Sequence, residues 1–167
     1  MVSRNNERAL ELAARYPASR EILEFYVELD AARRQQLRAA LDELSSPASA
    51  KCPACGHSAQ CAALRREGDG NALFLVCSCC AAEWPFPRTQ CPACLLDGEK
   101  HLSFYTAEQF PHLQTLLCQS CHRYLHVINC AMEIAAIPEV DELSATPLDV
   151  WAREQGYQKI TPNLGGI

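Results

Sequence analysis

The sequence CPAC at residues 52–55 recurs as CPAC at residues 91–94. A second motif, CSCC at residues 77–80, is matched by CQSC at residues 118–121. Each half of the central region is therefore a Cys-x-x-Cys pair, a gap of 21 or 23 residues, and another Cys-x-x-Cys pair. Two copies of one small metal-binding module explain this repeat economically.

The spacing of these cysteines is typical of a structural metal site. Two cysteines separated by two residues can place both sulfurs on one side of a tight turn. A tetrahedral ion needs two such turns facing each other, at metal–sulfur distances of about 2.3 Å for zinc. We expect two sites, each closed by four thiolates. The predicted ligands are Cys52, Cys55, Cys77 and Cys80 in the first site, and Cys91, Cys94, Cys118 and Cys121 in the second.

The sequence is compatible with other roles for the cysteines. An interleaved pairing, as in cross-brace domains, would join Cys52 and Cys55 to Cys91 and Cys94, but the sequential pairing matches the repeat better. A disulfide framework is typical of oxidising compartments, and unliganded pairs would leave many thiols unused. Of the three remaining cysteines, we expect Cys61 and Cys130 to be small buried residues and Cys79 to stay outside the ligand set. The three histidines near the sites are expected to form hydrogen bonds at the metal turns rather than to bind metal: His57, His122 and His126.

Four thiolates suit zinc, or a single iron ion as in rubredoxin. In rubredoxin-type turns the residue after the second cysteine is a glycine with positive φ. Only Gly56 fills that position here, and Ala81, Leu95 and His122 occupy the equivalent ones. This mildly favours zinc, so we expect two metal ions that are zinc or iron.

Helical patterns flank the cysteine-rich region. Apolar residues at helical spacing predict helix over 6–45, broken at Pro17, with a second helix over 18–45 that buries Leu37, Leu41 and Leu44. Ser45, Ser46, Pro47 and Ser49 predict a short hinge. Strand-like runs cover 73–76, 102–105, 113–117 and 124–129, and a last helix is expected from an N-cap at Thr146 to a stop at Gly156.

These patterns predict an α+β protein: an N-terminal helical segment, two tandem rubredoxin-like or zinc-ribbon-like four-cysteine modules, and a C-terminal helix. The expected divisions are a helical region at 1–50, metal modules at 51–90 and 91–130, and a C-terminal helix and tail at 131–167. Trp84-Pro85-Phe86-Pro87 bridges the modules and is expected to pack between them. An exposed docking patch is the alternative, with Trp84 and Phe86 as candidate partner-binding residues.

Composition narrows the function. The 167 residues carry a formal net charge of -5, and no run of about twenty apolar residues predicts a membrane span. The N-terminus lacks an apolar signal core, which indicates a cytoplasmic protein. Residues 51–130 carry six basic and six acidic groups, and eight thiolates with two divalent ions would add a charge of about -4. Such a region is a poor surface for nucleic acid.

The ordered set of motifs resembles the formate dehydrogenase accessory protein family, FdhE. The resemblance rests on CPACG at 52–56, CSCCAAEW at 77–84, CPAC at 91–94, CQSCHRYLHV at 118–127 and LDVWAREQGY at 148–157. The N-terminal RALELAARYP and ILEFYVELDAARRQQ also look like that family, and this chain is shorter than its typical members. His122 and Leu95 depart from the glycines usual there.

The resemblance implies a cytoplasmic maturation factor rather than an enzyme. Such a protein would bind the catalytic subunit of a formate dehydrogenase and assist its assembly or activation, with the eight paired cysteines as metal ligands. Two other functions are considered: a zinc-ribbon nucleic-acid-binding module, and a thiol-dependent enzyme that handles sulfur or selenium. A catalytic thiol would then have to be Cys61, Cys79 or Cys130. No membrane partner is expected, and self-association is not predicted either way.

Overall fold

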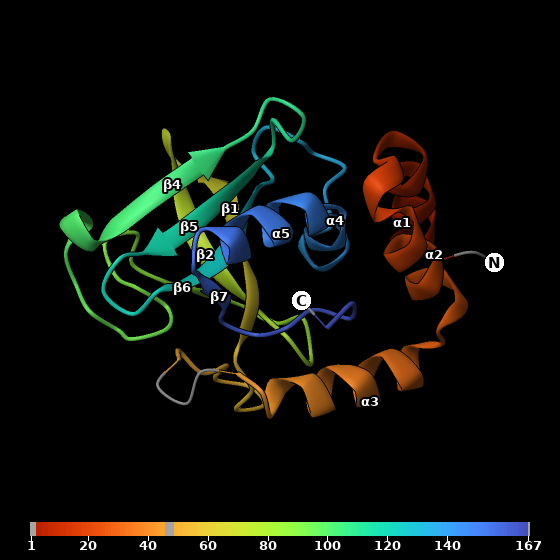
Figure 1. Ribbon diagram of the computed structural model, residues 1–167, viewed down its shortest axis with the longest axis horizontal. Helices are drawn as coiled ribbons and strands as arrows, with labels where there is room; N and C mark the ends of the chain where they lie inside the picture. The colour runs from red at the N-terminus through yellow and green to blue at the C-terminus, as the bar shows by residue number, and fades with distance from the viewer. Residues whose placement is uncertain (1–2, 46–48, 167) are drawn as a thin grey trace.

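The computed structural model describes residues 3–45 and 49–166. Its helices and strands, in chain order, are α1 (Arg4–Arg15), α2 (Arg20–Glu28), α3 (Ala31–Asp42), β1 (Ala59–Glu67), β2 (Gly70–Cys77), β3 (Glu83–Pro85), β4 (Leu102–Thr106), β5 (Leu113–Cys118), β6 (Arg123–Asn129), α4 (Pro138–Ser144), α5 (Thr146–Glu154) and β7 (Gln158–Lys159). Figure 1 shows α4 and α5 over the sheet, α1 and α2 beyond α4, and α3 along one side. The predicted α+β class is confirmed. Among the described helices, none combines the length and apolar character that crossing a membrane requires.

The sheet consists of two similar halves. Its strands lie in the order β3-β2-β1-β6-β5-β4, and β7 pairs with β6. Strands β1–β3 form one antiparallel meander and β4–β6 form another. The halves meet where β1 runs parallel to β6, with Ala62 opposite Val127 and Leu64 opposite Asn129. The repeat in the sequence is therefore a repeat in the fold, and a shared ladder of backbone hydrogen bonds joins its copies.

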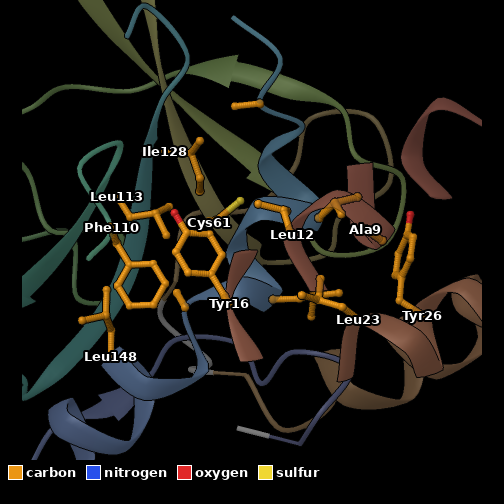
Figure 2. Packing of buried hydrophobic residues seen from close by; sticks show 14 of the residues in the cluster. Ala9, Leu12, Tyr16, Leu23, Tyr26, Cys61, Phe110, Leu113, Ile128 and Leu148 are labelled. Carbon is orange, nitrogen blue, oxygen red and sulfur yellow. The ribbon is translucent and has the colours of Figure 1, made fainter. Parts of the chain in front are cut away.

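Both faces of the central strands are covered, because successive side chains of a strand point to opposite faces. On one face, Cys61 of β1 and Ile128 of β6 pack with α1, α2 and α4 (Figure 2). Tyr16 and Phe110 lie in this cluster, with their ring centroids 4.6 Å apart. On the other face, Val127 and its neighbours pack against the loop that carries the second CPAC motif. One metal-binding loop is thus part of the core.

The N-terminal helices differ from the prediction in one respect. The helix expected over 18–45 is broken at Leu29, which has an extended backbone, and a new helix begins where the Asp30 side chain accepts a hydrogen bond from the backbone N–H of Arg33. The predicted burial beyond this break is wrong, since Leu37 is 38% exposed, Leu44 is 67% exposed, and α3 buries none of its residues. Ser46 and Pro47 of the predicted hinge lie outside the described residues.

The four predicted strand runs all fall within strands, but β1, β3, β7 and helix α4 were not predicted. The last helix stops as expected at Gly156, whose φ is +84°. The predicted N-cap is wrong. The Thr146 hydroxyl donates to the Leu143 carbonyl oxygen, because α4 ends immediately before α5 and supplies that acceptor.

Two buried carboxylates tie the C-terminal helices to the rest of the fold. Asp141 of α4 accepts hydrogen bonds from Arg8 Nε at 3.0 Å and from the backbone N–H of Ile137 at 2.8 Å, and it lies 3.0 Å from His112 Nε2. These contacts join α1, the start of α4 and the segment before β5. Since both Arg8 and Asp141 are buried, the pair fixes α1 relative to α4.

The second carboxylate, Asp149 of α5, lies fully buried at the centre of a larger network. Its Oδ1 accepts from the Tyr124 hydroxyl at 2.9 Å and from Lys159 Nζ at 2.8 Å, and lies 2.7 Å from His126 Nε2. Burial by itself would raise the pKa of Asp149, but the charges of Lys159 and His126 lower that pKa to about 2. Glu142 of α4 also pairs with Lys159. The network binds α4, α5 and β7 to β6.

We predict that the Asp149→Asn substitution destabilises the fold by about 3–5 kcal/mol, because it leaves the buried Lys159 with one carboxylate, Glu142, in place of two and removes the negative charge beside His126. Chemical unfolding in urea measures this as a lowered midpoint. The exposed Glu154→Gln variant on the same helix is the matched control, expected to change stability by less than about 0.5 kcal/mol. Equal midpoints for Asp149→Asn and wild type would contradict the role of the network.

Candidate metal centres

All four Cys-x-x-Cys pairs adopt the same turn. In each, the backbone N–H of the residue after the second cysteine donates to the carbonyl oxygen of the first. These hydrogen bonds are Gly56 to Cys52 at 2.9 Å, Ala81 to Cys77 at 3.3 Å, Leu95 to Cys91 at 2.9 Å, and His122 to Cys118 at 2.9 Å. We call these four turns the knuckles. Their common geometry orients two sulfurs at each knuckle in the same way.

Hairpins bring the knuckles together in pairs. The first knuckle of each half is closed by a single antiparallel bridge, Lys51 with Ser58 in one half and Gln90 with Asp97 in the other. The second knuckle follows at the end of β2 or β5. Because each of these strands is antiparallel to the one that follows the first knuckle, the hairpin returns the chain to its starting end.

The sulfur atoms converge into two clusters. All four within a cluster lie within 4.8 Å of one another, and the clusters are Cys52, Cys55, Cys77 and Cys80, and Cys91, Cys94, Cys118 and Cys121. Five of the sulfur–sulfur contacts lie between 3.3 Å, for Cys55 and Cys77, and 3.9 Å, for Cys94 and Cys118. A tetrahedral ion with bonds of about 2.3 Å requires separations of about 3.8 Å, so both clusters fit such an ion. The pairing of the knuckles is sequential, not interleaved.

The two clusters differ in burial. In each knuckle the first cysteine is buried and the second is more accessible. Cys55 and Cys80 of the first cluster are exposed, whereas Cys94 and Cys121 of the second are half-buried. The second cluster also contributes Cys91 and Cys118 to the apolar core on its face of the sheet. Loss of the second metal would therefore disturb the core directly.

Burial raises the pKa of four of the eight paired cysteines and so favours their thiol form: Cys77, Cys80, Cys91 and Cys121. Burial raises the pKa of Cys77 and Cys91 well above the usual range of a cysteine, and raises that of Cys121 to about 11. At Cys52 burial acts in the same direction, but hydrogen bonds from backbone N–H groups, led by Ala54, leave the pKa lowered. The same kind of N–H donation, toward sulfur in every knuckle, stabilises thiolates once a cation is bound.

Three of the four knuckles place a residue other than glycine in the conformation that glycine favours. Ala81, Leu95 and His122 have φ values of 57°, 60° and 53°, in the same left-handed region as Gly56 at 76°. The turn is therefore formed whichever residue fills the position, at a cost of about 1–2 kcal/mol for a side chain with a Cβ. Residue type at this point does not separate zinc from iron, and the identity of the metals is undetermined.

The remaining cysteines and histidines are placed as follows. Cys61 is fully buried, as predicted, while Cys130 is only half-buried. Cys79 lies outside the four-sulfur cluster. His57 contacts the Cys55 carbonyl oxygen at 3.1 Å, as expected of a side chain at a metal turn. The prediction for His126 is wrong: it lies in the buried network around Asp149, because its position on β6 points toward α5.

Trp84 and Phe86 lie at the edge of the sheet, on and just after β3. Both are half-buried and pack against the core cluster that includes Cys91 and Ala93 of the second half. Their buried portions thus pack against a core cluster to which both halves contribute, and packing of the segment between the halves stays a prediction. The rest of each ring is accessible.

The buried ionic networks were not predicted from the sequence. Asp141 and Asp149 lie among other polar residues of their segments, as solvent-exposed residues of a helix would. Lys159 follows the predicted end of the last helix. The only available signal was the polar residue His126 within the apolar run of β6. A histidine at this position indicates that its side chain has a buried hydrogen-bonding partner, but the sequence does not identify the carboxylate.

We predict that each four-cysteine cluster encloses one tightly bound metal ion, and that Cys55→Ser and Cys121→Ser each remove the enclosed ion of the substituted cluster while the other cluster keeps its ion. The thermal midpoint should fall further for Cys121→Ser, since the second cluster belongs to the core. Elemental analysis and thermal unfolding test this, with Cys130→Ser as the control that keeps both ions. An equal fall in the thermal midpoint for the two substitutions would contradict the difference in burial between the two clusters.

We also predict that metal binding weakens as the pH falls from 8 to 6. Raised thiol pKa values mean that protons leave when the ion binds, so lower pH favours the metal-free form. The apparent affinity should drop by about tenfold per pH unit for each proton released. Competition with a chromophoric chelator, corrected for the chelator's own protonation, measures it. An affinity independent of pH would show that the thiolates exist before the metal arrives.

Comparisons with known proteins agree with this architecture. No family model matches the chain. It is 28% identical over 116 residues to the FdhE homologue of Aquifex aeolicus, and 34% identical over 122 residues to that of Pseudomonas putida; each match covers 69% of this chain. The chain spans only 41% and 38% of those two relatives.

The crystal structure of the FdhE protein from Pseudomonas aeruginosa has a similar fold. The TM-score is 0.63 at 27% identity, over 95% of this chain and 57% of that one. The sequence similarity covers about two thirds of the chain, and the similarity of fold extends over nearly all of it. The resemblance to the FdhE family is thus confirmed, and the chain is a relative of the FdhE proteins.

Proposed function

We propose that this protein is a metal-stabilised accessory factor that binds the catalytic subunit of a formate dehydrogenase and assists its assembly or activation. The observation that carries the proposal is the pair of four-cysteine clusters, set in a fold similar to that of an FdhE protein. In this reading the eight paired cysteines hold two ions of zinc or iron, and the ions keep the knuckles and the sheet in one arrangement.

The arrangement of the thiols supports a binding role rather than catalysis. Catalytic zinc sites keep a coordination position open for water or substrate, whereas four protein ligands close the ion off. Each cluster offers four sulfurs. A structural zinc ion can contribute about 10–16 kcal/mol of apparent binding energy, which becomes folding energy in a small module. The metals would thus act by organising a surface.

The most suitable contact on that surface is the pair Trp84 and Phe86. Aromatic side chains that are partly buried lose little conformational freedom on binding and often dominate interface energies. Both rings are anchored by the core below them and remain accessible above. We propose that they contact the client, and that the protein acts in the cytoplasm, where thiols stay reduced.

We predict that the metal-loaded chain binds the formate dehydrogenase catalytic subunit of its own organism, and that Trp84→Ala or Phe86→Ala weakens binding at least about tenfold. Titration calorimetry with purified subunit measures the affinity. Phe104→Ala is the matched control, because Phe104 is also a half-exposed aromatic residue, on β4 at the other edge of the sheet. Metal content and thermal midpoint are recorded for each variant.

The other functions predict different results. A nucleic-acid-binding module would retain heparin or duplex DNA at moderate salt and ignore the subunit. A thiol enzyme would lose its function on Cys79→Ser while keeping two metal ions. Unchanged client affinity in both aromatic variants would move the contact elsewhere, and no affinity in the wild type would refute the proposed function.

A further inference from the structure

Cys79 and His57 have no place in the two clusters, yet they lie beside one of them. The Cys79 sulfur, a ring nitrogen of His57 and the Cys55 sulfur all lie within 4.8 Å of one another. Cys55 and His57 come from the first knuckle and its exit, and Cys79 comes from the middle of the second. The same hairpin that closes the first cluster therefore brings three soft donors together at its rim.

One hydrogen bond fixes the tautomer of the histidine. His57 Nδ1 lies 3.1 Å from the Cys55 carbonyl oxygen, and a carbonyl can only accept, so Nδ1 carries the proton. Nε2 then keeps the lone pair. Metal-binding histidines typically donate their other N–H to a carboxylate or to a backbone carbonyl in this way, which fixes the tautomer and the ring.

The position of Cys79 is also fixed. Its backbone N–H donates to the Cys77 sulfur at 3.4 Å, so the residue is part of the knuckle itself. Its side chain is half-buried, and it lines an open groove that α3 borders with Arg34 and Arg38. The thiol is thus held next to the cluster and reached from solvent.

The excess negative charge of the first cluster favours a further cation beside Cys55, although Arg34 and Arg38, which line the same groove as Cys79, oppose it. Four thiolates around one divalent ion carry a formal charge of two negative, and Cys55 is an exposed member of that set. A thiolate sulfur retains lone pairs after binding one metal and can bridge to a second. An added divalent ion with the Cys79 thiolate would reduce the excess charge to one negative.

We propose that Cys55, His57 and Cys79 form a third metal site, bridged to the first cluster through the Cys55 sulfur. Two sulfurs and an imidazole nitrogen suit zinc and other borderline-soft divalent ions. With three protein ligands the ion keeps a fourth position for water or an added thiol, so it binds more weakly than the enclosed ions. The site goes beyond the proposed accessory function and rests on the first cluster holding its own ion.

The experiment is a metal titration of the full chain, reduced and metal-free, under anaerobic conditions. Co²⁺ is the probe, followed by its visible and thiolate charge-transfer absorption, and native mass spectrometry counts bound Zn²⁺. The wild type should take up three equivalents, the third being the first removed by a competing chelator. Cys79→Ala and His57→Gln should each weaken the third equivalent at least about tenfold, because losing a ligand costs no less than losing a supporting group.

The first two equivalents should be unchanged in these variants, and Cys130→Ala is the control that keeps all three. Circular dichroism of the loaded proteins confirms folding, and His57→Gln stands alone if Cys79→Ala does not fold. Saturation of the wild type at two equivalents would overturn the third site only. So would a third equivalent that persists at full affinity in both variants. Fewer than two equivalents would refute the two enclosed sites as well.

Discussion

Each half of the sheet must bring four sulfur atoms within about 4 Å of one another, and this requirement determines how its strands are connected. Neither three-stranded meander is large, and β3 has only three residues. The knuckles close the ends of these meanders, and the hairpins between them have the length that returns the chain to its first knuckle. Everything else, including the helices and the buried carboxylates, is added to strands whose register the knuckles define.

Cysteine spacing predicted the composition of both clusters, because tetrahedral ligation restricts chain geometry more tightly than any propensity does. The four strand runs could also be predicted, because they are apolar and are bounded by turn residues. Strand β1 was not predicted, because alanine, leucine and arginine are common helix formers, and pairing with both β2 and β6 overrides that preference.

Features that depend on contacts between distant parts of the chain could not be predicted, for a different reason. The break at Leu29 and the exposure of Leu37 depend on what α3 packs against. The spacing of apolar residues predicts a helix, but it does not show whether another element covers the apolar side of that helix. The Asp141 network joins residues 133 positions apart, and the Asp149 network joins residues 25 positions apart. At the candidate site, the knuckles were predictable, but the closeness of His57 and Cys79 depends on how two knuckles face each other.

Strand β3 ends the sheet in a way that limits how another chain could join it. The N–H of Phe86 points inward and bonds to the Leu73 carbonyl oxygen, so alternation turns residues 85 and 87 outward. Both are prolines, which have no N–H to offer. By the same alternation Glu83 also faces outward, so an incoming strand would find one backbone donor among residues 83, 85 and 87. Strand addition at this edge would therefore be held by few backbone hydrogen bonds, while the rings of Trp84 and Phe86 flank Pro85 on the same segment.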